Sequence, residues 1–479
     1  MKVSVIIVNF NGKKYINECI DSVLDSSFKD FEVVMVENGS TDGSWQYLKE
    51  RYGKKQKVML VKLKENLFFA GGSNLGAKKA KGEWVIFLNS DTVVDRDFIK
   101  EMVKVVGENK KRLVQPKIKI YKTDKIDCVI GKYSWPGFGK AVGRGKKDNY
   151  KENIKGDYVN GTCFMVSKKF FFELNGFDED FKFFYEDVDF SLRAKKTGGK
   201  AWGAVEAVIE HKGSLSFKQN VAKDKVVYYY RRNRLLTILK NFKGLELLAR
   251  VLGLLIMSLF FGKLKVTVKA YGSVINMGLK KWFNLIRIKE LTRVVGKKKY
   301  SLLDLGCGDG ELINLAEERK IKAKGIDKVQ GMMIEKLKLK QRFNVVSLYH
   351  VLEHIKEPEM VLEMVKKWLK KQGILVIEVP IVGNLSEKWL GKDYLAYMDK
   401  THKHFWTKNR LFELLKQNGW RVKKQGVTGH QFPFTVITSS FRKGIAKGLL
   451  GTGLWLPLKL LSILRLNEEM VRLYCVKVK

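Results

Sequence analysis

Short apolar runs alternate with an amphipathic helical pattern over the first ninety residues of the chain. Continuous apolar runs predict buried strands at residues 3–8, 31–36, 58–63 and 85–88. Between the first two runs, apolar residues recur at helical spacing from Tyr15 to Leu24, which predicts a helix. Strands that alternate with helices favour an open α/β sheet.

Each of these predicted strands runs into a polar or glycine-containing loop. The loops are residues 9–12, 37–44, 65–76 and the sequence Asn89-Ser90-Asp91. In an open α/β sheet, ligands bind at the carboxyl ends of the strands, so a carboxylate in this position faces a crevice. Asp91 therefore predicts a metal or phosphate site, although an aspartate at a strand end is also a common helix cap.

These loops, together with three later motifs, resemble the family-2 glycosyltransferases of the GT-A fold, and more narrowly the rhamnosyltransferase-like branch that builds bacterial surface polysaccharides. The motifs occur in the family's order at residues 5–12, 37–44, 66–76, 89–91, 160–162, 176–179 and 184–189. The resemblance covers residues 1–240 and implies a GT-A domain with a Rossmann-like mixed sheet. It also implies inverting transfer of a sugar from a nucleotide-diphosphate donor.

The resemblance implies a divalent cation, Mg or Mn, that neutralises the diphosphate leaving group. Asp91 matches the last residue of the family's Asp-x-Asp motif, and Asn89 stands in place of the first aspartate. His211 falls where some relatives have a metal or phosphate contact. A single histidine is equally compatible with a structural role.

Donor and acceptor contacts are implied by the same resemblance. The donor contacts fall on Asn9, Asn38, Asp42 and Asn74. Of these, Asp42 matches the family's base- and ribose-contacting acid. Glu186 and Asp187 match its acceptor-side acid pair, in which we expect Asp187 to take the proton from the acceptor hydroxyl. Without these neighbours, a Glu-Asp pair is usually a solvated surface feature.

A second strand-and-glycine pattern begins near residue 301. The apolar run 301–305 leads into Gly306, Gly308 and Gly310 and then into a helical pattern, which brings backbone amides next to a ligand. Asp327 ends the next apolar run about twenty residues on, as a ribose-binding acid does in dinucleotide-binding domains. This pattern alone leaves the type of nucleotide cofactor open.

Downstream motifs favour one cofactor. Residues 344–355, 369–378, 402–405 and 418–420 resemble class I S-adenosylmethionine methyltransferases, and the resemblance covers residues 298–425. It implies that Asp304 and the three glycines surround the methionine part and the ribose, and that Asp327 holds the ribose hydroxyls. Only about seventeen residues separate Asp327 from Asn344, where the fold normally has a helix, a strand and an adenine-contacting acid. A degenerate domain that serves as a scaffold or acceptor-binding module is therefore the alternative.

Four of the six histidines lie in this region, at His350, His354, His402 and His404. A metal cluster is one interpretation. The methyltransferase resemblance instead assigns His350 and His354 to a motif that shapes the cofactor and acceptor pocket. In a third interpretation, His404 is the base that acts on a sugar hydroxyl.

The chain is strongly basic, with 91 Lys and Arg against 50 Asp and Glu and a formal net charge of +41. Such a charge suits nucleic acid, anionic lipid or phosphate-bearing substrates. The sequence has no helix-turn-helix, zinc-finger or RNA-stacking motif, which argues against a nucleic-acid partner.

The distribution of charge points to a membrane surface. Residues 240–299 contain fourteen Lys and Arg against two Glu, a net charge of +12, around the apolar run 251–261. This run is too short to span a bilayer. A second apolar segment, 445–464, is long enough but is interrupted by two lysines and a proline. Both favour elements that lie in an anionic membrane interface, with Trp455 as an anchor. Buried helices between domains are the alternative.

These observations predict a two-domain α/β enzyme. The expected segments are a glycosyltransferase domain at 1–240, a basic amphipathic linker at 241–297, a methyltransferase-like domain at 298–430 and an apolar, basic tail at 431–479. The five cysteines show no pairing or metal spacing, and the chain opens on a strand without a secretory signal. We therefore expect a cytoplasmic protein, peripheral on the inner face of the membrane, that acts on a glycan or lipid-linked acceptor. The alternatives are a glycosyltransferase with an inactive second domain and a non-catalytic assembly factor that binds glycans or nucleotide sugars.

Overall fold

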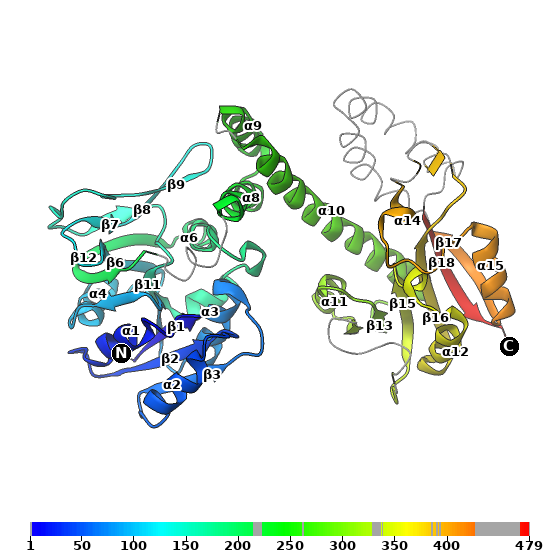
Figure 1. The fold of residues 1–479 in the computed structure, drawn as a ribbon, viewed down its shortest axis with the longest axis horizontal. Coiled ribbons are helices and arrows are strands. Elements are labelled where there is room, and N and C mark those ends of the chain that lie inside the picture. The colour runs from blue at the N-terminus through cyan, green and yellow to red at the C-terminus, as the bar shows by residue number, and fades with distance from the viewer. Residues whose placement is uncertain are drawn as a thin grey trace. The chain divides into compact units, whose positions relative to one another are not determined.

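The computed structural model describes residues 2–213, 223–260, 263–327, 337, 339–384, 387–388, 391, 394–426 and 470–478. The chain divides into two compact units, Met1–Val274 and Ile275–Lys479, each with its own sheet and core (Figure 1). The division falls inside helix α10 (Leu264–Val295), within the segment that the sequence predicts to be a linker.

The first unit is built on a ten-stranded mixed sheet. Its strands are β1 (Val3–Asn9), β2 (Phe31–Glu37), β3 (Val58–Lys62), β4 (Trp84–Asn89), β5 (Thr92–Val94), β6 (Arg112–Ile120), β7 (Ile126–Cys128), β10 (Ile154–Gly156), β11 (Cys163–Ser167) and β12 (Lys200–His211). Their order is β10-β12-β6-β11-β4-β1-β2-β3, with β5 paired to β12 and β7 to β6. Strands β3, β2, β1 and β4 run parallel to one another, whereas β11 is antiparallel to β4. The four predicted strands form this parallel block.

Helices cover both faces of the parallel block. Val5 and Ile7 of β1 face α1 (Ile16–Leu24), α2 (Ser44–Tyr52) and α4 (Phe98–Val106) in one apolar core. Ile6, between them, belongs to the core on the other face, with α3 (Phe68–Lys79), α5 (Lys168–Glu173) and α6 (Glu186–Lys196). Because successive side chains of a strand point to opposite faces, a strand covered on both sides reads as a continuous apolar run.

The first unit continues past residue 240. Helices α8 (Lys223–Asn241) and α9 (Gly244–Phe260) and the start of α10 contribute Leu236, Leu254 and Ala270 to a core with Phe181 and Tyr185. The first half of the expected linker thus packs onto the sheet-containing part of this unit. A hairpin of β8 (Gly131–Ser134) and β9 (Phe138–Ala141) lies outside the main sheet.

The second unit has a six-stranded sheet. Its strands are β13 (Ser301–Leu305), β14 (Lys322–Ile326), β15 (Phe343–Tyr349), β16 (Leu369–Pro380), β17 (Trp420–Gly426) and β18 (Met470–Lys477), in the order β14-β13-β15-β16-β18-β17. The first four run parallel, and β18 is antiparallel to both of its neighbours. In the described part of the chain, β14 pairs only with β13. Residues 328–336, in the short segment noted from the sequence, lie outside the described residues. The predicted fold class, α/β for both domains, is confirmed.

The last strand departs from the expected tail. Residues 470–477 form β18 inside the second sheet, and its side chains are almost all buried. Arg472 in this strand is buried because its guanidinium donates to Glu378 and Glu290. A charged residue at a buried strand position is rare unless it is paired, which explains why this segment does not read as a core strand.

The predicted interfacial segment 445–464, including Trp455, lies outside the described residues. Among the helices that are described, none is both long enough and apolar enough to cross a membrane.

Candidate active site

The polar strand ends of the first unit meet at one edge of its sheet. Because β1, β2 and β4 are parallel, the loops that follow them lie side by side. A cavity of about 390 Å³ opens there. Its walls include the predicted site residues Asn38, Asn89, Asp91, Glu186, Asp187 and His211. Six predicted residues from four separate stretches of sequence thus share one cavity.

Strand pairing brings Asp91 and His211 together. Strand β12 runs antiparallel to β5, and its last residue, His211, lies opposite Thr92. The backbone N–H of Lys212 donates to the Asp91 carbonyl at 3.0 Å. Nε2 of His211 is 3.4 Å from Oδ1 of Asp91, and its Nδ1 is 3.0 Å from Oδ2 of Asp127 in β7. The imidazole therefore lies between two carboxylates.

The electrostatics of this group favour a protonated imidazole. Both Asp91 and His211 are buried, and burial by itself lowers the pKa of His211. Hydrogen bonds to Asp127 and Asp91 outweigh burial and raise the pKa of His211 to about 9. A cation that replaced this proton would find the Asp91 carboxylate and Nε2 of His211 already adjacent.

Asn89 also lines the cavity. Its backbone N–H donates to the Thr162 carbonyl at 2.9 Å, and its carbonyl accepts the Thr92 hydroxyl at 2.7 Å. These two hydrogen bonds hold the turn after β4. Both are made by the backbone of Asn89 and do not involve its side-chain amide. Its amide oxygen is a neutral ligand type that Mg²⁺ and Mn²⁺ accept.

The acid pair lies at the start of α6. Oδ2 of Asp187 accepts the Gly161 N–H at 2.7 Å, and Oδ1 accepts the Val188 N–H at 2.7 Å. Burial raises the pKa of Asp187, and these backbone donors oppose the rise. Burial raises the pKa of Glu186 well above its ordinary value, and the negative charge of Asp187 adds to this rise. Oε2 of Glu186 is buried and has no hydrogen-bond partner among the described residues. The two acids thus have different environments, with Asp187 the better stabilised as a carboxylate.

The backbone just before this pair is strained. Phe184 and Tyr185 both have positive φ angles, 64° and 70°, which side-chain-bearing residues rarely adopt. Asn233 of α8, which is buried, donates its amide to the carbonyls of Phe181, at 2.7 Å, and Phe184, at 2.9 Å. Strained backbone persists where surrounding contacts hold it, and such places are frequent at functional sites.

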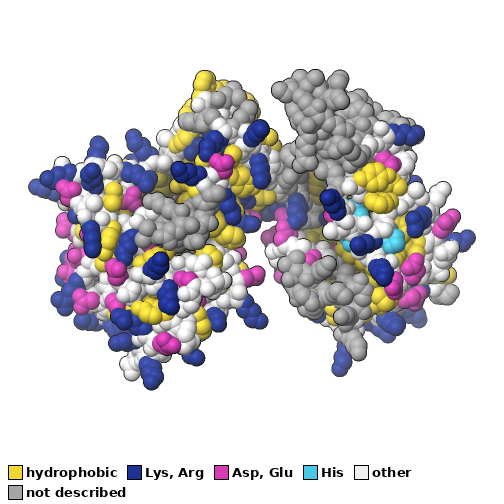
Figure 2. Space-filling model, viewed as in Figure 1, with side chains coloured by type: hydrophobic (Ala, Val, Ile, Leu, Met, Phe, Trp, Pro, Cys, Tyr) yellow, Lys and Arg dark blue, Asp and Glu magenta, His cyan; other side chains and the backbone are white. Residues whose placement is uncertain are grey.

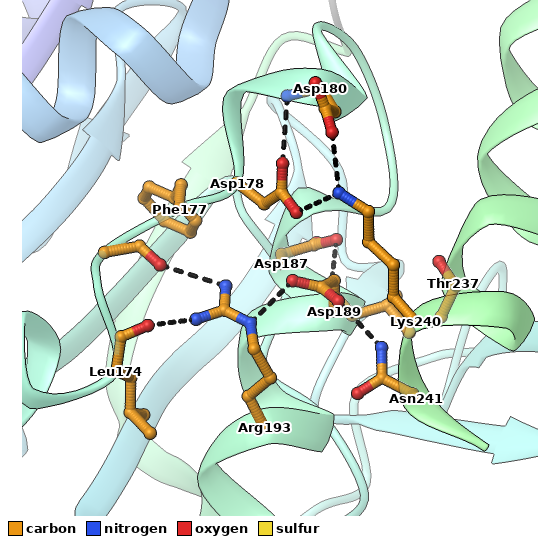
Figure 3. A network of polar contacts seen from close by, with 12 residues as sticks. Leu174, Phe177, Asp178, Asp180, Asp187, Asp189, Arg193, Thr237, Lys240 and Asn241 are labelled. Carbon is orange, nitrogen blue, oxygen red and sulfur yellow. Dashed lines mark hydrogen bonds and ion pairs between the residues drawn. The ribbon is translucent and has the colours of Figure 1, made fainter. Parts of the chain in front are cut away.

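A network of polar contacts also ties α6 to neighbouring segments (Figure 3). Asp189 accepts from Arg193 Nε at 2.8 Å and from Asn241 Nδ2 at 2.7 Å. The Arg193 guanidinium also donates to the carbonyls of Leu174 and Gly176. The motifs 176–179 and 184–189 are therefore joined to one another and to α8, which fixes the direction of Asp187.

The four predicted donor residues differ in their surroundings. Asn38 lines the cavity, and its amide bonds to Asn66 and to the backbone of Leu67 and Phe68. Asn9 is buried and does not line the cavity. Its amide donates to Glu37 at 2.7 Å, and its Oδ1 has no hydrogen-bond partner among the described residues.

Asn74 and Asp42 do not line the cavity. The Asn74 amide is engaged by the backbone N–H and carbonyl of Phe177 and by Glu179. Asp42 is exposed, and its carboxylate accepts the backbone N–H groups of Lys13 and Ser44, the first residue of α2. In this structure both side chains hold loops in place.

The glycine loop of the second unit follows β13. Asp304 at the strand end is buried, accepts the Ser347 hydroxyl at 2.6 Å, and has its pKa raised by burial to about 6. The N–H of Gly308 donates to Asp327 Oδ2 at 2.8 Å. Gly306 has a φ of 74°, and a Cβ there would lie 2.3 Å from the Val351 side chain. The structure thus brings Asp304, Gly306, Gly308 and Asp327 together.

Gly310 follows in the same loop and precedes helix α11 (Glu311–Glu317) with a φ of 75°. Among the described residues, a Cβ at Gly308 or Gly310 would meet nothing within 4 Å, so these residues leave space above this loop. His404, the expected base, is partly exposed, and its Nε2 lies 3.3 Å from the Lys356 carbonyl. The His404 ring stacks on Trp406.

Sequence analysis did not single out three residues at or beside the first site. Asp127 contacts His211 but lies in a three-residue strand without a motif. Asn233 lies in the middle of a helix whose pattern gave no sign of a contact with the loop 181–184. Arg144, in the loop after β9, lines the cavity and is 3.5 Å from Asp127.

Comparisons with known proteins support both halves of the chain. Residues 4–174 match the family model described as Glycosyl transferase family 2, and residues 281–425 match the model described as a methyltransferase domain. Both resemblances inferred from the motifs are thereby confirmed at the level of the domain.

Curated relatives match the N-terminal part. Poly(ribitol-phosphate) beta-N-acetylglucosaminyltransferase TarS of Staphylococcus aureus is 33% identical over 125 residues, 25% of this chain and 21% of TarS. Putative teichuronic acid biosynthesis glycosyltransferase TuaG of Bacillus subtilis is 32% identical over 106 residues, 22% of this chain and 42% of TuaG. The aligned region spans less than half the length of either relative.

Solved structures with a similar chain path include S. aureus TarS 1–349 in complex with UDP-GlcNAc, at 19% identity and a TM-score of 0.42, covering 57% of this chain and 81% of that one. GalNAc-T7 with UDP, GalNAc and Mn²⁺ has 20% identity and a TM-score of 0.40, covering 44% of each chain.

The environment of His211 leads to a pH prediction. Its folded pKa of about 9 lies above the ordinary value of about 6.5. The stabilisation by its charge is therefore complete below about pH 6.5 and is lost as the pH rises through 9. In an NMR titration, we expect the resonance that is missing in His211→Gln to titrate near pH 9, and Asp127→Asn to lower that midpoint. A midpoint near 6.5 in the unsubstituted protein would contradict the two-carboxylate environment.

Proposed function

We propose that this chain, which carries a family-2 glycosyltransferase domain followed by a methyltransferase domain, transfers a sugar from a nucleotide-diphosphate donor to a glycan or lipid-linked acceptor with inversion, and methylates a sugar or related acceptor. The observation that carries the first part is the cavity of the first unit. Asp91 and His211 line this cavity together with Glu186 and Asp187. A group that can hold a cation and a group that can accept a proton thus share one cavity.

Asp91, His211 and Asn89 would hold a divalent cation. The 3.4 Å between Oδ1 of Asp91 and Nε2 of His211 is close to the spacing of two neighbouring ligands on one ion. A bound Mg²⁺ or Mn²⁺ would neutralise the diphosphate leaving group. Asp127 holds the far side of the imidazole and orients Nε2 towards Asp91.

Asp187 is the proposed base. Two backbone N–H groups hold its carboxylate and stabilise its charged form. Burial and the neighbouring charge of Asp187 raise the pKa of Glu186, so the pair favours a state with a single negative charge. In this state Asp187 accepts the proton of the acceptor hydroxyl, and Glu186 contributes a neutral hydrogen-bonding group beside it.

The acceptor class is proposed from charge and from relatives. TarS is named as a poly(ribitol-phosphate) transferase and TuaG as a teichuronic acid biosynthesis enzyme. A strongly basic chain suits an acceptor that carries phosphate or carboxylate groups. Both considerations support a polymeric or lipid-linked acceptor in surface polysaccharide synthesis.

The glycine loop of the second unit supports S-adenosylmethionine binding. Asp304, Gly306 and Gly308 would surround the methionine part and ribose, and Asp327 would hold the ribose hydroxyls. The Gly308 N–H already fixes the Asp327 carboxylate, and the space above Gly308 and Gly310 is open. S-adenosylmethionine supplies the methyl group in such domains. The edge position of β14 within the described sheet favours the alternative of an inactive scaffold.

An exposed apolar face on α9 supports membrane association. Five of its apolar residues recur on one side of the helix, each between 46% and 85% exposed: Leu245, Leu248, Leu252, Leu255 and Ile256. Exposed lysines flank the helix at Lys243, Lys263 and Lys265. Figure 2 shows Lys and Arg side chains spread over the visible face of the first unit. An apolar helix face flanked by lysines is the pattern of an element that lies in an anionic membrane interface. A helix buried against another domain remains the alternative.

Substitution of the two acids Asp91 and Asp187 should affect different steps, donor binding for the first and turnover for the second. Asp91→Ala should weaken metal-dependent donor binding, whereas Asp187→Asn should leave donor binding unchanged and lower turnover at least about 100-fold, the usual contribution of a general base. Calorimetry with nucleotide sugars, with and without Mn²⁺, and a turnover assay measure the two effects.

The exposed Glu206→Gln in β12 is the control for an acid-to-amide change, and melting curves test folding. Undiminished turnover by Asp187→Asn would refute the assignment of the base. If Mn²⁺ strengthened donor binding by Asp91→Ala as much as it strengthens binding by the unsubstituted protein, the cation site would be refuted.

Methyl transfer requires cofactor binding. Isothermal titration of the full chain should show S-adenosylmethionine binding in the micromolar range, about −8 kcal/mol. Gly308→Arg should abolish it by filling the open space above the loop, and Asp327→Ala should weaken it without changing a positive φ. The absence of heat with the unsubstituted protein would favour the scaffold alternative, and binding of NAD instead would overturn the methyltransferase interpretation.

Membrane binding should depend on the α9 face and on charge. The full chain should co-sediment with anionic vesicles, be partly released at high salt, and bind neutral vesicles less well. Changing Leu248, Leu252 and Leu255 together to Glu should weaken binding at least about tenfold, since burial of one leucine contributes roughly 1.5–3 kcal/mol. The matched control changes Ile120, Met360 and Val478, three apolar residues exposed elsewhere. Equal binding by both triple variants would contradict an interfacial role for α9.

A further inference from the structure

Three potential metal ligands converge in the second unit. Glu353 and His354 lie in a short 3-10 helix (Leu352–His354) that follows β15, and His402 lies in the segment before α15 (Lys408–Gln417). One carboxylate oxygen of Glu353 and one ring nitrogen of each histidine lie within 4.8 Å of one another. The two imidazole rings are 4.7 Å apart, centroid to centroid.

Backbone hydrogen bonds hold the two segments together. The carbonyl of Glu353 accepts the N–H groups of Lys403 and His404, at 2.7 Å and 3.1 Å. The approach of His402 to His354 is therefore a consequence of main-chain pairing between segments about fifty residues apart in sequence.

Hydrogen bonds also determine which ring nitrogens are free. Nδ1 of His402 lies 2.7 Å from the Ala396 carbonyl, which can only accept, so this nitrogen carries the proton. Nδ1 of His354 lies 2.9 Å from the Thr401 hydroxyl, which itself donates to Asp399 at 2.6 Å. The hydroxyl proton is thus committed to Asp399, and Thr401 accepts from His354. In both rings Nε2 keeps its lone pair, as in metal-binding histidines whose other nitrogen donates to a protein oxygen.

The Glu353 carboxylate has little to replace its lost hydration. The residue is 0% exposed, and among the described residues neither carboxylate oxygen has a hydrogen-bond partner. His350 lies at ion-pair distance, with Nδ1 3.6 Å from Oε1. His350 also faces Glu378, at 3.4 Å. A buried carboxylate is costly unless it is paired or coordinates a metal.

We propose that Glu353, His354 and His402 bind a divalent transition-metal ion. Two imidazole nitrogens and one carboxylate oxygen form a ligand set that suits Zn²⁺ and its neighbours better than Mg²⁺. Three protein ligands leave a coordination position open for water or for an oxygen of another molecule.

The place of the site relates it to the glycine loop. Val351 is two residues before Glu353, and its side chain occupies the space beside Gly306. The proposed ion is therefore close in sequence to a residue that packs against the loop proposed to hold the methyl donor, and we assign its open coordination position to a molecule bound at that loop. This last point rests on the proposed methyl transfer, whereas metal binding itself does not.

Metal titration of the full chain tests the proposal. After chelation and dialysis, the protein should take up Co²⁺ and Zn²⁺, the former with visible absorption bands typical of imidazole ligation. Loss of any one ligand should weaken the affinity for one metal ion per chain, as tested in His354→Gln, His402→Gln and Glu353→Gln. The loss of affinity should exceed roughly 100-fold, which is the upper end of the cost of removing only a hydrogen-bonding neighbour of a ligand. His404→Gln, two residues from His402, is the matched control and should retain the affinity for that ion.

Two further arms separate this site from the cation site proposed in the first unit and from misfolding. His211→Gln should leave metal binding by Glu353, His354 and His402 unchanged. Loss of metal binding at one site can therefore be distinguished from loss at the other. In the unsubstituted protein, Zn²⁺ should protect His354 and His402, but not His404, from diethylpyrocarbonate, as read by mass spectrometry. Equal modification of the three histidines with and without Zn²⁺, or equal loss of metal in His404→Gln, would overturn the proposal.

Discussion

Removal of carboxylates from water is the constraint on which both units depend. A buried acid is stable only when cations, hydrogen-bond donors or a metal replace the lost hydration. The chain meets this requirement with partners from distant segments. Asp91 meets His211, Asp189 meets Arg193 and Asn241, and Glu378 meets Arg287 and Arg472. Each pairing ties together elements that the sequence separates by tens of residues or more, apart from the short-range pair of Asp189 with Arg193.

In the first unit these pairings also set the direction of the reactive groups. The contacts of Asp189 fix α6 from one side, and Asn233 holds the strained turn at Phe184 and Tyr185 from another. Asp187 is left with backbone N–H groups as its only hydrogen-bond donors among the described residues. A carboxylate so held keeps its geometry while it gains or loses a proton, which is the property a general base needs.

In the second unit the same requirement is met more fully at one acid than at another. Glu378 is surrounded by Arg287, Arg472 and His350, and these charges lower its pKa well below the ordinary value although burial alone would raise it. Glu353 shares His350 with Glu378, and no hydrogen bond to its carboxylate occurs among the described residues. A metal ion beside Glu353 would supply the charge that the two arginines supply to Glu378.

The sequence by itself determined the two α/β domains and the position of Asn89 and Asp91 at a strand end, because these depend on local hydrophobic period and on the residues that follow each strand. Glu186 and Asp187 were expected at the site only from the motifs of the glycosyltransferase resemblance, and both line the cavity. Only the tertiary structure decided the partners. Asp127 and Asn233 reach the site through strand pairing and helix packing, which leave no local pattern. The same holds for β18, where Arg472 is buried only because Glu378 and Glu290 neutralise it. Asn74 and Asp42 lie in recognisable motifs, yet contacts to Phe177 and Ser44 give them structural tasks. Local patterns fix which segments form strands and helices, whereas the match of a buried charge to its partner exists only once those segments meet.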